Sequence, residues 1–208
     1  MNNPATFYIV RHGETEWNTK GLLQGQGDSP LTSDGIKQIA DLEKELASIH
    51  FDHVFSSDLM RAKQTAEILN IERKLAINTT HLLRERAFGK YEGKTREEFQ
   101  EGNRNLIEKF EKLSKEQKWK FKYADDMESN EELITRLLVF LRETAVAYPG
   151  KTILVVSHGG ALRVLLAHLG YELTKSKGLI GNGAYIKLLS DGSDFEVKEM
   201  KRIVAESV

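Results

Sequence analysis

The 208-residue sequence contains no cysteine, only three prolines and no long run of apolar residues. The absence of cysteine excludes disulfide bonds, a thiolate nucleophile and cysteine-ligated zinc, although it leaves the cellular compartment open. No segment approaches the roughly 18 consecutive apolar residues that mark a membrane-spanning helix. Six residues precede the first apolar run, which is too few for a secretory signal, and we therefore expect a cytoplasmic protein.

An excess of either charge is also lacking, because 30 lysines and arginines oppose 31 aspartates and glutamates and leave a formal net charge of −1. This balance gives no overall attraction to nucleic acid or to an anionic membrane, so we expect neither partner. Any recognition of phosphate must then be local. The 40% hydrophobic and 29% charged fractions are typical of a globular protein, and the length favours a single domain over residues 1–208 with a modest insertion.

Three short runs, at residues 7–10, 54–55 with their flanks, and 152–156, predict buried parallel strands because they are continuously apolar rather than alternating. Apolar positions at helical spacing follow each run, beginning near Thr32 or Ser33, Ser57-Asp58, and Gly159-Gly160. Residues 184–189 and 195–200 predict two further strands joined by a turn. The pattern predicts an α/β fold: a three-layer αβα sandwich with a mostly parallel central sheet, an antiparallel edge strand and a helical lid insertion.

The insertion is predicted at about residues 90–130, where charges of both signs are mixed with scattered aromatic residues. We interpret this segment as a lid over the ligand-binding edge of the sheet. The alternative, which stays open at this point, is a solvated helical excursion that a few aromatic residues anchor. A helix over about residues 130–147 then returns the chain to the core.

Polar side chains follow the predicted strands and suit an anion: Arg11, His12, Arg61 and His158. Neighbouring strand ends of such a sheet converge on one crevice. Arginine forks bind phosphate oxygens in pairs, and the glycines Gly13 and Gly159 let backbone amides approach the anion closely. A metal site fits less well, because the arginines would repel a cation and no third ligand has suitable spacing. The residues therefore predict a phosphate site.

Six sequence blocks, in order along nearly the whole chain, resemble the histidine phosphatase superfamily, also called the phosphoglycerate mutase-like family. The blocks are RHGETEWN from residue 11, QGQGDSPLT from residue 24, SSDLMRAKQTA from residue 56, LRERAFGKYEG from residue 83, ESNEEL from residue 128 and VVSHGGALRVLL from residue 155. One such block alone would be weak support, whereas six linked blocks are strong.

The resemblance implies a role for each matching residue. His12 would be the nucleophile that forms a phosphohistidine, and Glu85 would give a proton to the leaving oxygen and then act as the base for water. The residues that would bind the phosphoryl group are Arg11, Arg61 and His158. Further substrate contacts are implied at Asn18, Gln24 and Gly25, although Asn18 also suits a helix cap. No metal or organic cofactor is implied.

Physical chemistry adds requirements to these roles. A nucleophilic His12 needs an acceptor on its other ring nitrogen, for which the carbonyl of Gly13 is a candidate, and flanking arginines should lower its pKa. Glu85 has to carry a proton before the first step. We therefore expect its neighbours Arg84 and Arg86 to face outward, because their charges would oppose that protonation.

The sequence also bears on the reaction. Mutases of this family carry a longer insertion and an Arg-His-Tyr-Gly signature after the glutamate, whereas this chain has Arg-Ala-Phe-Gly at residues 86–89. We therefore expect a phosphatase acting on small phosphorylated metabolites; a phosphoglycerate mutase and a non-catalytic phosphate-binding module are the alternatives. Leu22 stands where the family often has arginine. Lys90, Lys94 and Arg96 either bind a second anionic group or pair with glutamates of the insertion. Monomer and homodimer both stay open.

Overall fold

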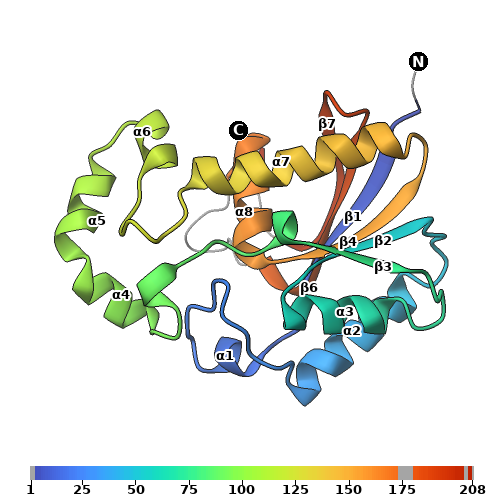
Figure 1. Ribbon diagram of the computed structural model, residues 1–208, viewed down its shortest axis with the longest axis horizontal. Helices are drawn as coiled ribbons and strands as arrows, with labels where there is room; N and C mark the ends of the chain where they lie inside the picture. The colour runs from blue at the N-terminus through green and yellow to red at the C-terminus, as the bar shows by residue number, and fades with distance from the viewer. Residues whose placement is uncertain (1–2, 173–179, 204–205, 208) are drawn as a thin grey trace.

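The computed structural model describes residues 3–172, 180–203 and 206–207, and its centre is a six-stranded sheet in the order β3-β2-β4-β1-β6-β7 (Figure 1). The sheet strands are β1 (Ala5–Arg11), β2 (His53–Ser57), β3 (Ile77–Thr80), β4 (Thr152–Ser157), β6 (Ile180–Ser190) and β7 (Phe195–Ile203). The first four are parallel, whereas β6 runs antiparallel to both β1 and β7. The predicted antiparallel edge is thus a hairpin. A separate pair joins β5 (Tyr171–Glu172) to β8 (Glu206–Ser207).

Helices cover both faces of the sheet, which confirms the three-layer sandwich (Figure 1). On one face lie α2 (Ser33–Glu45) and α3 (Met60–Leu69), and on the other α7 (Asn130–Ala147) and α8 (Gly159–His168). Alternate side chains of β1 enter the two cores: Phe7 and Ile9 pack with α7 and α8, while Tyr8 and Val10 pack with α2 and α3. A strand buried on both faces must be apolar throughout, which explains its sequence.

Two of the three predicted helix starts are confirmed, and the third is wrong. Thr32 caps α2 by accepting a bond from the amide of Gly35, and α8 begins at Gly159. The helix predicted to start at Ser57-Asp58 begins instead at Met60, and no side chain of its N-cap residue caps it. The carboxylate of Asp58 is occupied by Arg84. Asp28, from a distant loop, accepts the bond from the Met60 amide instead.

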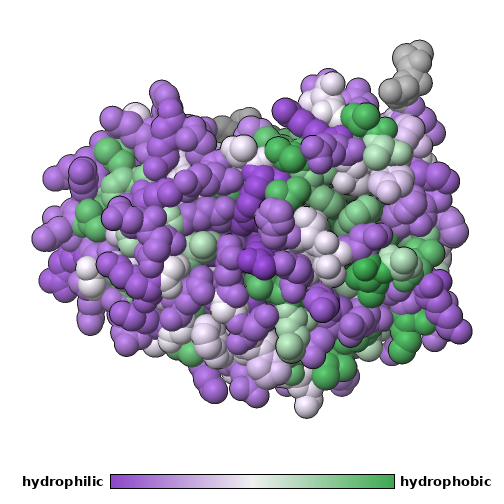
Figure 2. Space-filling model, viewed as in Figure 1, coloured by the Kyte–Doolittle hydropathy of each residue, from purple (hydrophilic) through white to green (hydrophobic). Residues whose placement is uncertain are grey.

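The segment between β3 and α7 contains the predicted helices, set to one side of the layered core (Figure 1). Its elements are η1 (His81–Leu83), η2 (Gly89–Tyr91), α4 (Arg96–Gly102), α5 (Arg104–Glu111) and α6 (Lys115–Lys120). The ring of Tyr123 contacts the rings of Phe99, Phe110 and Phe121, and the distances between ring centroids are 5.1, 5.7 and 5.0 Å. The visible surface of this segment is mostly hydrophilic (Figure 2). These four aromatic residues thus form a small cluster of their own, whereas Trp119 packs against the main core. The action of the segment as a lid stays a prediction.

None of the helices in the described part of the chain combines the length and apolar character needed to cross a bilayer.

Candidate active site

A cavity of about 560 Å³ lies at the carboxyl ends of the parallel strands. The parallel register of β1 and β4 sets Arg11 opposite Ser157, so the residues that follow, His12 and His158, lie side by side with ring centroids 5.2 Å apart. The predicted site residues that line the cavity are Arg11, His12, Asn18, Gln24, Gly25, Arg61, Glu85 and Gly159. His158 is fully buried beside His12, behind this lining.

The backbone fixes the tautomer of His12, which is only 3% exposed. Its Nδ1 lies 2.7 Å from the carbonyl oxygen of Gly13. Because a carbonyl only accepts, Nδ1 carries the proton and Nε2 keeps its lone pair. Nε2 in turn accepts a bond from Arg61 Nε at 3.3 Å. The lone pair of the ring is therefore on Nε2, where it accepts the bond from the Arg61 guanidinium.

The surroundings keep this imidazole neutral. Burial lowers the pKa of His12 well below its usual value of 6.5, and the positive charges of Arg61 and Arg11 lower it further. The bond to Gly13 acts in the opposite direction but does not reverse the shift. A neutral ring with one proton on Nδ1 is the form in which a histidine can act as a nucleophile.

Arg61, on the first turn of α3, is fully buried and holds the loop that forms one wall of the cavity. Its guanidinium donates to the carbonyls of Gly25 and Gly27, both at 2.7 Å, and to Asp28 at 3.2 Å. Gly25 has a positive φ of 55°, a backbone region that other residues rarely adopt. Arg61 therefore connects the loop to His12 as well as presenting positive charge to the cavity.

Three buried nitrogens at this site have no hydrogen-bond partner among the described residues: Arg11 Nε, His158 Nδ1 and His158 Nε2. Burial is the main cause that lowers the pKa of Arg11 to about 10, and it also lowers the pKa of His158 well below 6.5. Polar groups this deeply buried usually have partners. An anionic oxygen in the cavity would supply an acceptor for Arg11 Nε and for the one nitrogen of a neutral His158 that carries a proton.

Glu85 lies at the N-terminus of α8, where its Oε2 accepts a bond from the Gly160 amide at 2.8 Å. Its Oε1 accepts one from the Arg86 amide, also at 2.8 Å. A Cβ at Gly160 would overlap Oε1, and a Cβ at Gly159 would lie 3.1 Å from Arg11 Nε. Both glycines are thus needed for the carboxylate and the guanidinium to approach the helix.

The expectation that Arg84 and Arg86 face outward is correct for Arg84 and wrong for Arg86. Arg84 is partly exposed and binds Asp58 with two bonds of 2.7 and 2.6 Å. Arg86 instead lines the cavity, because the start of α7 offers it two acceptors, the carbonyl of Glu128 and the side chain of Asn130.

The amides beside the cavity have structural partners as well. Asn18 forms a capping box with Thr15 at the start of α1 (Glu16–Thr19), which confirms the helix cap. It also lines the cavity, and its contact with substrate stays a prediction. Gln24 Nε2 donates to the Thr15 hydroxyl at 2.7 Å, while its Oε1 is buried without a partner among the described residues. Asn182 donates to the carbonyl of His12 at 3.1 Å and to Asn18 at 3.2 Å, which connects β6 to the site.

The cavity contains two arginines that sequence reasoning did not assign to it, Arg86 and Arg163. Arg163 follows Gly159 by four residues, about one helical turn, and that spacing was a usable signal. Arg96 also lines the cavity, whereas Lys90 and Lys94 lie over the ring of Tyr91 at 5.3 and 5.8 Å from its centroid.

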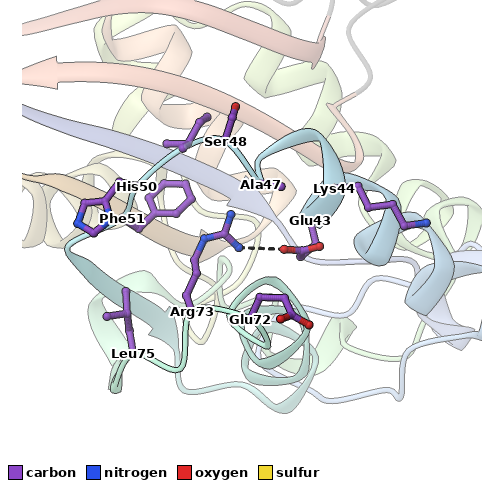
Figure 3. Close-up of a pocket in the computed structure, with 10 residues that line it drawn as sticks. Glu43, Lys44, Ala47, Ser48, His50, Phe51, Glu72, Arg73 and Leu75 are labelled. Atoms are coloured by element: carbon purple, nitrogen blue, oxygen red, sulfur yellow. Dashed lines mark hydrogen bonds and ion pairs between the residues drawn. The ribbon is translucent and has the colours of Figure 1, made fainter.

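A second cavity of similar size lies at the opposite, amino ends of β2 and β3 (Figure 3). Its central guanidinium, that of Arg73, pairs with Glu43 at 3.2 Å and donates to the carbonyls of Leu69 and Leu46. These bonds occupy Arg73 structurally, so we assign the functional site to the carboxyl ends.

Known proteins resemble this chain in sequence and in fold. The sequence pattern of the histidine phosphatase superfamily (branch 1) matches residues 7–202. The chain is 34% identical over 161 residues to the uncharacterized phosphatase PhoE of Bacillus subtilis, covering 77% of this chain and 75% of that protein. It is also 34% identical over 168 residues to the probable phosphoglycerate mutase GpmB of Proteus mirabilis, covering 77% and 72%.

The solved structure of Bacillus stearothermophilus YhfR superimposes with a TM-score of 0.79 at 30% identity, over 93% of this chain and 95% of that one. Relatives named as a phosphatase and as a probable mutase therefore share sequence with this chain, and YhfR shares its fold. The protein belongs to the histidine phosphatase superfamily.

Proposed function

We propose that the protein is a phosphomonoesterase that hydrolyses small phosphorylated metabolites through a phosphohistidine on His12. The observation that carries the proposal is the 2.7 Å contact between His12 Nδ1 and the Gly13 carbonyl, which leaves the lone pair on Nε2 beside Arg61. A buried, neutral imidazole held next to guanidinium groups is suited to attack a bound phosphoryl group.

In the first step, the phosphoryl oxygens bind to Arg11, Arg61 and His158, whose donors stabilise the charge on the transferring group. His12 Nε2 forms a bond to phosphorus while the bond from phosphorus to the ester oxygen breaks. The departing oxygen takes the proton of Glu85 and leaves as an alcohol. Once Nε2 is bonded to phosphorus, the N–H that Arg61 donates to it becomes available to a phosphoryl oxygen.

In the second step, water attacks phosphorus and Glu85, now ionised, accepts its proton. The nitrogen–phosphorus bond breaks, inorganic phosphate leaves, and His12 returns to its neutral form. Each step needs one proton transfer at Glu85, and no redox change occurs. The part of the chain that the structure describes contains no group of three His, Asp or Glu placed to hold a metal ion. In the proposed reaction His12, Glu85 and the phosphate-binding residues carry out each phosphoryl and proton transfer.

The charges of the cavity favour a substrate with a second anionic group. The described lining of the cavity contains five arginines, Arg11, Arg61, Arg86, Arg96 and Arg163, and one carboxylate, that of Glu85, while Asp28 outside the lining pairs with Arg61. Burial and then the nearby charge of Arg96 lower the pKa of Arg163. A phosphate dianion at His12 balances only two of these positive charges. A carboxylate or second phosphate on the alcohol portion would reduce the repulsion that remains.

The test is release of inorganic phosphate from a panel of small esters, comparing wild type with His12→Ala in the presence of a chelator. Chelator-resistant release that His12→Ala abolishes is expected. Exchange between 3- and 2-phosphoglycerate without net release would show a mutase instead. Binding of the esters with neither release nor exchange would show a non-catalytic module.

A further inference from the structure

Arg136, on α7, does not line the cavity, yet it is bonded to the main chain that carries Glu85. Its guanidinium donates to the carbonyls of Leu82 at 2.8 Å, Arg84 at 2.7 Å and Glu85 at 3.0 Å. Three carbonyls within residues 82–85 therefore share one cation. This arrangement is separate from the bonds that the Glu85 carboxylate makes itself.

Glu128 completes the arrangement from the residues just before α7. Its carboxylate pairs with Arg136 through Oε1 and Oε2 at 2.7 and 2.9 Å, and Oε2 also accepts a bond from the Ala87 amide at 3.3 Å. With these contacts all five N–H groups of Arg136 have acceptors. The two side chains are only 15% and 14% exposed, so the pair is largely shielded from water.

We propose that Arg136 is a positioning residue, which with Glu128 fixes residues 82–87 so that the Glu85 carboxyl group meets the leaving oxygen. The inference rests on the proposed function of Glu85 as acid and base. A catalytic group displaced by about 1 Å can lose about 10²-fold in rate. A planar fork with five donors suits this task, whereas lysine has a single ammonium and cannot reproduce its geometry.

The chain contains a matched control at the other end of the sheet (Figure 3). Arg73 likewise donates to two backbone carbonyls, of Leu69 at 2.6 Å and Leu46 at 2.7 Å, and pairs with Glu43. The exposures of this second pair, 13% and 15%, match those of the first. Loss of either arginine should therefore cost similar stability, while only Arg136 holds the segment around Glu85.

The test compares two esters in wild type, Arg136→Met, Arg136→Lys, Glu128→Gln, Arg73→Met and Glu85→Gln. Dinitrophenolate leaves without a proton, whereas the alcohol of glycerol phosphate needs one. For Arg136→Met we expect kcat on glycerol phosphate to fall about 10²-fold, while the burst of dinitrophenolate release stays within about threefold of wild type. Arg136→Lys and Glu128→Gln should show the same preference more weakly, and they remain informative if Arg136→Met does not fold.

Arg73→Met should lower the melting temperature without changing the ratio between the two esters. An equal fall on both esters for Arg136→Met, or the same ratio in Arg73→Met, would overturn the positioning role. Glu85→Gln separates this inference from the proposed function. If Glu85→Gln shows the expected ester preference and the Arg136 variants do not, only the positioning role fails. If Glu85→Gln shows no preference in an active enzyme, the acid role of Glu85 fails first.

Discussion

Arg61 Nε lies 3.3 Å from His12 Nε2, so a buried guanidinium donates a hydrogen bond to the lone pair of the candidate nucleophile. The same charge is, after burial, the largest cause of the lowered pKa of His12. Arg61 thus connects two requirements of the proposed reaction, a neutral imidazole and a cation for the phosphoryl oxygens. Each requirement can be measured separately.

Removal of the Arg61 charge should shift the acid limb of the pH–rate profile, which is the pH range in which phosphorylation slows as the pH falls. In Arg61→Gln the pKa of His12 should rise, because a lowering charge is lost, and the pH below which phosphorylation slows should rise with it. The rate at neutral pH should also fall about 10²-fold or more. Single-turnover rates against pH provide the measurement. In Arg61→Lys, which keeps the charge, the acid limb of the pH–rate profile should lie closer to that of wild type. An acid limb at the wild-type pH in Arg61→Gln would contradict the electrostatic explanation.

The two buried histidines should make the fold sensitive to mild acid. His12 and His158 both have a pKa lowered well below 6.5 in the folded protein, so only the unfolded chain gains their protons as pH falls through 6.5. The free energy of unfolding should then decrease as pH falls below 6.5, and both groups should contribute to this slope. Urea unfolding at several pH values measures this slope.

Single replacements show how much each histidine contributes to the slope of the free energy of unfolding against pH. His12→Asn and His158→Asn should each remove part of it, because each takes away one group that only the unfolded chain protonates. A slope that survives in the double variant His12→Asn/His158→Asn would show that other groups cause the acid sensitivity.

Gly160→Ala should separate activity from stability. Its new methyl group would overlap Glu85 Oε1 and displace the carboxylate, and we expect kcat on alkyl phosphates to fall about 10- to 100-fold. Alanine favours a helix over glycine, so the melting temperature should not fall in proportion. The matched control is Gly102→Ala in α4, where an added Cβ meets no atom within 4 Å. Full activity in Gly160→Ala would argue against the observed position of Glu85.

Arg96→Gln tests the preference for a second anionic group. We expect KM for 3-phosphoglycerate to rise about tenfold and KM for glycerol 3-phosphate to change less, because only the first carries a carboxylate. The control is Lys90→Gln, since Lys90 lies over Tyr91 outside the cavity lining. Equal changes for the two esters would contradict the preference.

Much of the fold could be predicted because β1 and β4 are buried on both faces and their sequences are apolar throughout. β3, with the sequence Ile-Asn-Thr-Thr, was not predicted, because a short edge strand that is partly polar has no such signal. The start of α3 was predicted wrongly for a different reason. Its cap is Asp28, which only the tertiary structure brings to Met60.

The site likewise contains residues that the sequence predicts and residues that only the tertiary structure places. Arg11, His12 and His158 could be predicted to meet because each lies at the carboxyl end of a parallel strand or directly after it. Arg86 and Arg136 could not, since their places depend on how α7 packs against residues 82–87. Long side chains that reach acceptors on another element leave no periodic pattern in the sequence.

The most direct test of the account is to trap the phosphoenzyme. Glu85→Gln, incubated with dinitrophenyl phosphate labelled in its phosphoryl group and quenched in alkali, should accumulate label, because the first step needs no acid with this ester and the second lacks its base. The account predicts acid-labile label on His12 and none in His12→Ala. Stoichiometric phosphate release by wild type with no label on His12 in either protein would contradict it.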